Sequence, residues 1–260
     1  MNPLLTFGDR LVIGHRGAPT LAPENTIESF RIAMDRGADA LELDVHLSAD
    51  GVPVVIHDPR LDRTTGHPGQ VAALTVDEIQ AVDAGATFTP DGGCTYPWRG
   101  RGVRVPTLTE VLHALPGVPL LIELKTPAAQ EAVRRVILEH DAVERTVPAA
   151  ASRAALTAFR DPPFRCGGSA REIGRLFWGT AFRLPNPRPR YATLSVPHRY
   201  YGLLVPTARF LAAARRAGTP VHVWTVDNPL QARHLWARGA TGMVTNVPGR
   251  LVKARGELRG

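Results

Sequence analysis

The chain has 260 residues and 44% of them are hydrophobic, enough for one large domain with a sizeable core. No apolar run approaches the roughly 18 residues of a membrane-spanning helix. No basic region followed by an apolar core opens the chain, so we expect a soluble, cytoplasmic protein. The formal net charge of +7 comes mainly from scattered arginines without a recognition motif, which disfavours nucleic-acid binding. Attraction to anionic substrates and peripheral contact with membranes stay open.

The first predicted elements are a short strand and a helix. Residues 11–14 form an apolar run that ends at His15, and glycines on either side of His15 and Arg16 allow the backbone to approach a ligand closely. A helix follows, with Thr26 as its N-cap, and its apolar stripe stops at Gly37. The strand therefore delivers an imidazole and a guanidinium group to one place.

Two carboxylates follow on the second strand, residues 40–46. Side chains on a strand alternate between its two faces, so Glu42 and Asp44 project the same way and place two oxygen ligands side by side. A reversal at residues 50–51 then sends the chain back toward these carboxylates, and His57 stands at the end of the returning run.

A third carboxylate comes much later. Residues 59–106 are rich in loops, and we expect this insertion to carry function or to cover a site. Regular structure resumes with a helix, then a strand at 120–124 that carries Glu123 and is followed by Lys125. Carboxylates around a divalent cation, flanked by two imidazoles and basic side chains, can cleave a phosphate ester.

The strand count predicts the fold class. Beyond the three strands above, further strands are expected at 146–150, 164–168, 191–196, 220–225 and 242–245. Eight strands that mostly alternate with helices predict an α/β protein, a (β/α)8 TIM barrel, in one domain over residues 1–260. Active sites of such barrels lie at the C-terminal strand ends. The candidates at or near these ends are His15, Glu42, Asp44, Glu123 and Trp224.

Several short motifs occur in a definite order along the chain. They are His15-Arg16-Gly17, Pro23-Glu24-Asn25-Thr26, Glu42-x-Asp44, Val54-Val55-x-His57-Asp58, Pro106-Thr107-Leu108, Glu123-x-Lys125, Trp224-Thr225-Val226 and Thr245-Asn246-x-Pro248. Together they resemble the glycerophosphodiester phosphodiesterase family, and the resemblance covers most of the chain.

The resemblance implies metal-dependent hydrolysis of a small-molecule glycerophosphodiester to glycerol 3-phosphate and an alcohol. Its implied cofactor is a divalent cation, Mg²⁺ or Ca²⁺. The residues it implies are the metal ligands Glu42, Asp44 and Glu123, the acid–base pair His15 and His57, and the substrate-binding Arg16, Lys125 and Trp224. We expect His15 to be the base and His57 the acid, but the sequence does not determine which of the two has which role.

Several alternatives stay open at this point. The attacking group can be water, or a substrate hydroxyl that forms a cyclic phosphate. A phospholipase D-like enzyme acting on lysophospholipids or sphingolipids would use the same chemistry, and a silent barrel could bind phosphorylated ligands without turnover. Headgroup preference, metal identity and oligomeric state are not determined by these patterns.

Overall fold

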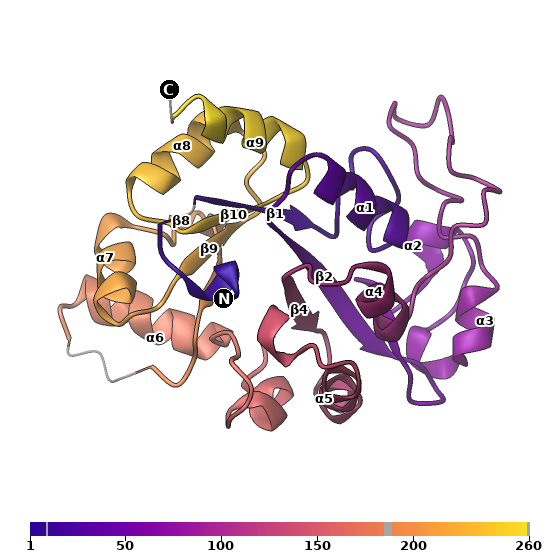
Figure 1. The fold of residues 1–260 in the computed structure, drawn as a ribbon, viewed down its shortest axis with the longest axis horizontal. Helices are drawn as coiled ribbons and strands as arrows, with labels where there is room; N and C mark the ends of the chain where they lie inside the picture. Colours follow the sequence, from indigo (N-terminus) through magenta and orange to yellow (C-terminus); the bar gives the residue numbers. More distant parts are fainter. Residues whose placement is uncertain (9, 185–188, 259–260) are drawn as a thin grey trace.

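The computed structural model describes residues 1–8, 10–184 and 189–258. Within them, seven strands pair in parallel in the order β5-β4-β2-β1-β10-β9-β6, and β3 (Pro53–Val55) joins β2 in an antiparallel hairpin (Figure 1). The parallel strands are β1 (Leu11–His15), β2 (Ala40–Leu47), β4 (Leu120–Leu124), β5 (Thr146–Ala149), β6 (Leu194–Pro197), β9 (Val221–Trp224) and β10 (Gly242–Thr245).

The prediction of a fifth barrel strand at 164–168 is wrong, because this segment does not form a regular strand. This segment makes a single bridge, between Gly167 and Thr193. Gly167 N donates to the carbonyl of Pro148 at 2.8 Å, and Gly168 N donates to the carbonyl of Thr193 at 2.9 Å. Two glycines after a Pro-Pro pair favour strand structure poorly, because glycine has no side chain to pack and proline has no N–H to donate. These few hydrogen bonds still connect β5 to β6, and they nearly close the predicted TIM barrel.

Helices lie on the outside of the ring, where they cover the outward faces of the strands (Figure 1). The first follows the predicted signals, since Thr26 Oγ1 accepts from the N–H of Ser29 and the backbone turns left-handed at Gly37. The helices after the barrel strands are α1 (Ile27–Asp35), α4 (Leu108–Ala114), α5 (Gln130–Glu139), α6 (Ala170–Ala181), α7 (Ala208–Arg216), α8 (Pro229–Ala237) and α9 (Pro248–Gly256), together with the 3-10 segments η3 (Pro127–Ala129), η4 (Val143–Arg145) and η5 (Arg153–Phe159).

The inside of the barrel is layered. Its N-terminal end is apolar and is closed by the short turn η1 (Pro3–Leu5), whose Leu4 packs against Leu11, Ile13 and Leu121. Leu4 also accepts a hydrogen bond through its carbonyl from His222 Nε2 at 2.9 Å. Because inward positions recur every second residue, the next inward positions toward the C-terminal ends carry the charged side chains.

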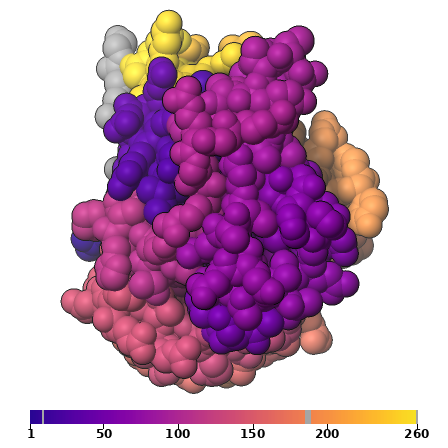
Figure 2. All heavy atoms as spheres, turned by 90° about the vertical axis from the view of Figure 1, so that its right-hand side faces the viewer, coloured from indigo at the N-terminus to yellow at the C-terminus, as the bar shows by residue number. Residues whose placement is uncertain are grey.

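The insertion at 59–106 lies beside the barrel. It contains α2 (Asp62–Thr65), η2 (Val71–Ala73) and α3 (Val76–Gln80), and it has a separate apolar cluster that includes Leu61, Ile79 and Val105. Figure 2 shows its purple and magenta surface over much of the end of the molecule that carries α2 and α3. The insertion therefore has enough core to hold a defined position next to β3.

Three further segments complete the description. A two-stranded hairpin, β7 (Arg199–Tyr200) and β8 (Leu203–Leu204), follows β6. Tyr201 and Gly202 both have positive φ, as the turn of a tight hairpin requires.

The proline-rich connection expected at 184–190 falls mostly outside the described residues. No helix in the described part of the chain is long and apolar enough to cross a membrane; the cytoplasmic location stays a prediction.

Candidate active site

The register of the sheet brings the predicted residues together. His15 on β1 is the direct neighbour of Glu42 on β2, and Asp44 on β2 is the direct neighbour of Glu123 on β4. His15 is the last residue of β1 and Glu123 the last but one of β4, and the pairing places Glu42 level with His15 and Asp44 level with Glu123. The parallel arrangement thus places an imidazole and three carboxylates at one mouth of the barrel.

The three carboxylates form a compact cluster. One oxygen each from Glu42, Asp44 and Glu123 lies within 4.8 Å of the other two. Glu42 and Asp44 are buried, whereas Glu123 is partly exposed. Burial, followed by the charges of Asp44 and Glu123, raises the pKa of Glu42 well above its ordinary value. Positive charge close to this cluster therefore favours the ionised form of Glu42.

Two basic side chains face Asp44. Lys125 Nζ lies 2.7 Å from Asp44 Oδ1 and 3.1 Å from Glu123 Oε2, and Arg16 Nε lies 3.0 Å from Asp44 Oδ2. Asn25 Nδ2 donates to the same Oδ2 at 2.9 Å. Although burial opposes it, the charges of Lys125 and Arg16 lower the pKa of Asp44. Neither ion pair has the alignment of a hydrogen bond, so Asp44 Oδ1 is a buried oxygen without an aligned donor.

His15 is held by a relay of two side chains. Asn246 donates its Nδ2–H to Asp227 Oδ2 at 2.8 Å, which fixes the orientation of the amide and turns its Oδ1 toward His15. His15 Nδ1 therefore carries the proton and donates to Asn246 Oδ1 at 2.7 Å. His15 Nε2 is left with a lone pair, 4.0 Å from Glu42 Oε2. Burial and the charge of Arg16 lower the pKa of His15, which favours the neutral ring.

His57 has a different partner. It follows β3, and its Nδ1–H donates to Asp58 Oδ1 at 2.6 Å. Asp58 Oδ2 accepts from Arg63 Nε of the insertion, also at 2.6 Å, and this bond leads the causes that lower the pKa of Asp58 to about 2. His57 is therefore paired with an ionised carboxylate, whereas His15 is paired with a neutral amide. His46 donates from Nε2 to the carbonyl of His57 at 3.0 Å and braces the end of the hairpin.

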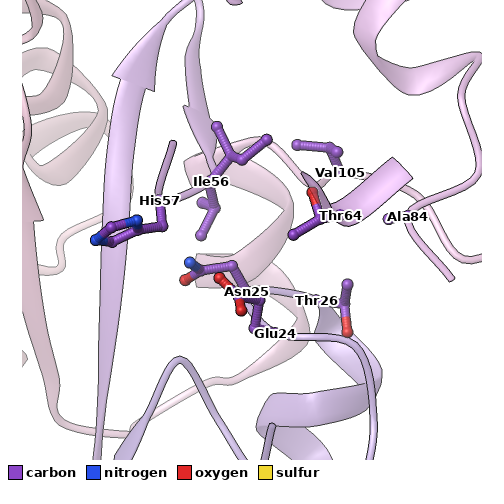
Figure 3. Close-up of a pocket in the computed structure, with 9 residues that line it drawn as sticks. Glu24, Asn25, Thr26, Ile56, His57, Thr64, Ala84 and Val105 are labelled. Atoms are coloured by element: carbon purple, nitrogen blue, oxygen red, sulfur yellow. The ribbon is translucent and has the colours of Figure 1, made fainter. Parts of the chain in front are cut away.

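Glu24 joins the two halves of the site. Its carboxylate accepts from Arg16 Nη1 at 2.9 Å and from both Nη groups of Arg63 at 2.7 and 2.8 Å. Alternating charges thus run without a break from Asp58 through Arg63, Glu24 and Arg16 to Asp44. Figure 3 shows the pocket beside this network, which is lined by Glu24, Asn25 and His57 together with Thr64, Ala84 and Val105 of the insertion, although the His57 ring points away from those three.

The backbone between β1 and α1 is tightly constrained. Arg16 has φ +54° and Gly17 has φ +91°. A Cβ atom at Gly17 would lie 2.4 Å from Ser29 Oγ, well inside the closest contact that a Cβ atom makes with a non-bonded heavy atom. Ser29 Oγ donates to the carbonyl of Arg16 and accepts from the N–H of Ala18. The glycine in this motif is therefore required for close packing on α1, and that packing aims Arg16 at Asp44.

Trp224 lies apart from the charged cluster. It is the last residue of β9, and 42% of its surface is exposed. Its carbonyl accepts from the N–H of His198 at 2.7 Å, at the base of the hairpin formed by β7 and β8. It stands on the same mouth of the barrel as the carboxylates.

The donor set fits a divalent cation. Oxygen ligands of Mg²⁺ or Ca²⁺ lie about 2.0–2.6 Å from the ion, so oxygens that share one ion are at most about 4–5 Å apart. The three carboxylate oxygens meet this limit. Hard carboxylate ligands without cysteine or histidine favour Mg²⁺ or Ca²⁺ over softer metals.

The same chain matches known proteins over most of its length. The profile of the Glycerophosphoryl diester phosphodiesterase family matches residues 15–250. A glycerophosphodiester phosphodiesterase from Caldanaerobacter subterraneus is 32% identical over 251 residues, which cover 93% of this chain and 96% of the relative. The chain belongs to this family. Membership confirms the family, the barrel fold and the phosphoric diester hydrolase class predicted above.

Solved structures of the family share the fold. The phosphodiesterase domain of a protein from Mycobacterium tuberculosis matches with a TM-score of 0.84 at 22% identity, covering 96% of this chain and all of that one. A phosphodiesterase from Oleispira antarctica, solved with its product sn-glycerol-3-phosphate, matches with a TM-score of 0.77 at 23% identity, covering 98% of this chain and 100% of that one.

The structure gathers most of the predicted site residues. His15, Arg16, Glu42, Asp44, Glu123 and Lys125 form one contacting group, which His57 joins through Asp58, Arg63 and Glu24. Sequence reasoning gave no role to Asp227, Asn246 or Arg63. Asn246 lies in one of the family motifs, but only the folded chain shows that its amide reaches His15.

Proposed function

We propose that this family member hydrolyses glycerophosphodiesters to glycerol 3-phosphate and an alcohol, with His15 and His57 as the proton-transferring groups. The observation that carries the proposal is the position of two imidazoles with different hydrogen-bond partners. Both lie beside a cluster of three carboxylates and two basic side chains. The product found in the relative from Oleispira antarctica supports glycerol 3-phosphate as the product here.

We infer that Glu42, Asp44 and Glu123 hold Mg²⁺ or Ca²⁺. When bound, such a cation polarises the phosphate and lowers the pKa of a coordinated hydroxyl or water. Burial raises the pKa of Glu42, so this residue gains most from a neighbouring positive charge that keeps it ionised. Lys125 supplies part of that charge in the described structure, through Asp44 and Glu123.

The two histidines differ in the way that a base and an acid require. His15 presents an unprotonated Nε2 to the carboxylate cluster, because Asn246 takes its Nδ1–H. It is suited to take a proton from the attacking hydroxyl. His57 has an ionised carboxylate on Nδ1, which compensates a positive imidazolium, so it is suited to give a proton to the leaving alcohol.

Arg16 and Lys125 would stabilise the charge that develops on the phosphoryl oxygens. Both are partly buried at the barrel mouth, where screening by water is reduced. Trp224 would form a wall of the glycerol pocket. The proposal accommodates attack by water and attack by a substrate hydroxyl, because both nucleophiles need the same base.

We also propose that the insertion at 59–106 covers the site within a single domain. Arg63 reaches from α2 to Glu24 and Asp58, and Trp98 Nε1 donates to the carbonyl of Leu21 at 3.0 Å. These contacts attach the insertion to the loop that follows β1. The insertion therefore borders the pocket of Figure 3 on one side.

The test measures glycerol 3-phosphate release from a panel of glycerophosphodiesters with Mg²⁺, with Ca²⁺ and with chelator. His15→Ala and His57→Ala should each lower turnover by about 10² or more, whereas His234→Ala, on the exposed side of α8, should not. Calorimetric titration with Mg²⁺ or Ca²⁺ should detect binding that Glu123→Gln weakens. Release that persists in chelator, or in either histidine variant, would overturn the corresponding role.

A further inference from the structure

Although arginines are scattered along the whole chain, the excess of positive over negative charge is concentrated in one stretch. Residues 145–226 contain thirteen arginines, no lysine and two carboxylates, Asp161 and Glu172, which gives a formal charge of +11 against +7 for the whole chain. The remaining residues are therefore net acidic. This stretch builds the side of the barrel that runs from β5 to β9, where α6 and α7 pack together (Figure 1).

Four exposed arginines lie on the catalytic face of that side. Arg153 begins η5 after β5, Arg171 and Arg209 lie in the first turns of α6 and α7, and Arg199 begins the β7–β8 hairpin. Each position follows the C-terminal end of a barrel segment, so these arginines share the face that carries the active site. We call them the arginine rim.

Few carboxylates are available to offset this charge. Glu172 forms an ion pair with Arg160 at 3.0 Å, and Asp227 accepts hydrogen bonds from Asn246. Asp161 follows the far end of η5, away from the catalytic face. Glu131 is exposed in the first turn of α5, which packs on η5, but four arginines still leave the rim with a net positive charge, which suits an anionic partner.

The same face presents apolar side chains at the tip of the hairpin. Tyr200, Tyr201 and Leu203 are exposed, with 90% of the Tyr201 surface accessible. Arg199 Nη1 donates to the carbonyl of Gly202 at 2.8 Å, and the rings of Tyr200 and Tyr201 meet edge to face. The tip is thus braced in a shape that holds its apolar groups outward.

We propose that the arginine rim and the hairpin tip dock this protein on anionic lipid bilayers, with the mouth of the barrel beside the membrane surface. Tyrosine and leucine side chains surrounded by arginines match the chemistry of the interface, where rings and alkyl groups enter below the headgroups and guanidinium groups meet phosphates. The hairpin base touches Trp224 at the barrel mouth, so docking would bring the active site close to phosphodiesters in or leaving the bilayer.

The test is sedimentation of the full chain with vesicles of phosphatidylcholine alone and of phosphatidylcholine mixed with phosphatidylglycerol. Binding should need the anionic lipid and should fall with added salt. Tyr201→Ser/Leu203→Ser should weaken binding by at least about tenfold. Arg153→Gln/Arg209→Gln should weaken it by about 25-fold, since one arginine near an anionic surface contributes about fivefold.

Matched controls come from the opposite end of the same helices. Phe182, 68% exposed after α6, and Arg216, at the end of α7, lie away from the catalytic face. Phe182→Ser and Arg216→Gln should bind vesicles like wild type, and all variants should keep their turnover of a water-soluble diester. Absent binding, equal losses in the controls, or equally tight binding of a single-stranded oligonucleotide would each overturn the proposal. Because vesicle binding is read without turnover, its failure leaves the proposed hydrolysis intact.

Discussion

Replacing Asn246 with alanine tests the proposed role of His15 as the general base. The substitution removes the acceptor of the His15 Nδ1–H, a hydrogen bond of 2.7 Å. The lost bond alone corresponds to about 1 kcal/mol, or about fivefold. The freed ring can also rotate or move its proton to Nε2, where it blocks the lone pair that a base needs. We expect the two effects together to lower kcat by about 10- to 100-fold, the usual range for residues that orient a functional side chain without contacting the substrate.

The pH profile distinguishes this explanation from a change in charge. Burial and the charge of Arg16 lower the pKa of His15, whereas the hydrogen bond that His15 donates to Asn246 raises it. Asn246→Ala should therefore lower this pKa further, so the neutral ring is present over a wider pH range. The acidic limb of kcat/KM should move to lower pH, and the loss of kcat should persist at every pH, with KM nearly unchanged. A loss that disappears at high pH would contradict the reasoning.

Asn228→Ala is the matched control. Its side chain caps α8 by accepting from Leu230 N and Gln231 N, so its loss should cost about 1 kcal/mol of stability without changing kcat. Asp227→Asn offers a second check, because it removes the acceptor that fixes the Asn246 amide. Wild-type kcat in Asn246→Ala, or an equal loss in Asn228→Ala, would refute a role in positioning His15.

Three further outcomes follow from groups around the site. Burial lowers the pKa of His222 to about 4, so as the pH falls the unfolded chain takes up a proton on His222 before the folded chain does. The free energy of unfolding measured in urea should therefore fall by about 3 kcal/mol between pH 6.5 and 4. His222→Asn should reduce this dependence on pH, and an unchanged dependence would contradict the lowered pKa of His222. Gly17→Ala should cost about 1–3 kcal/mol more than Gly51→Ala by the same assay, because both have positive φ but only Gly17 packs against α1; equal costs would count against the close contact. Arg63→Ala should lower kcat about tenfold, because an ion pair with two carboxylates of the site is lost, whereas the equally exposed Arg60→Ala should not.

The cluster of carboxylates was predictable because it depends on short-range geometry. Alternation along β2 puts Glu42 and Asp44 on one face whatever the rest of the fold does. The neighbours of that face depend only on the parallel register, which places Glu123 beside Asp44 once a barrel is assumed. The hairpin that brings His57 back toward the carboxylates was predictable from the turn residues at 50–51. Each of these inferences needed no knowledge of a distant side chain.

The misses arise where structure depends on few residues or on distant ones. The segment at 164–168 contributes only a bridge at Gly167, because its two glycines and the preceding proline pair favour strand structure poorly. The hairpin after β6 has strands of two residues each, too short for alternation to be read. The relay from Asp227 to His15 joins residues more than 200 positions apart, and no local pattern reports such a contact.

Two histidines with the same intrinsic chemistry can do opposite work only if their surroundings differ. In this barrel the difference lies in what accepts the Nδ1 proton. A neutral amide accepts it from His15, whose burial beside Arg16 disfavours a positive ring. An ionised carboxylate accepts it from His57, and Arg63 keeps the pKa of that carboxyl at about 2. The proposed base and acid are thus distinguished by their partners, and exchanging those partners would be expected to impair both proton transfers.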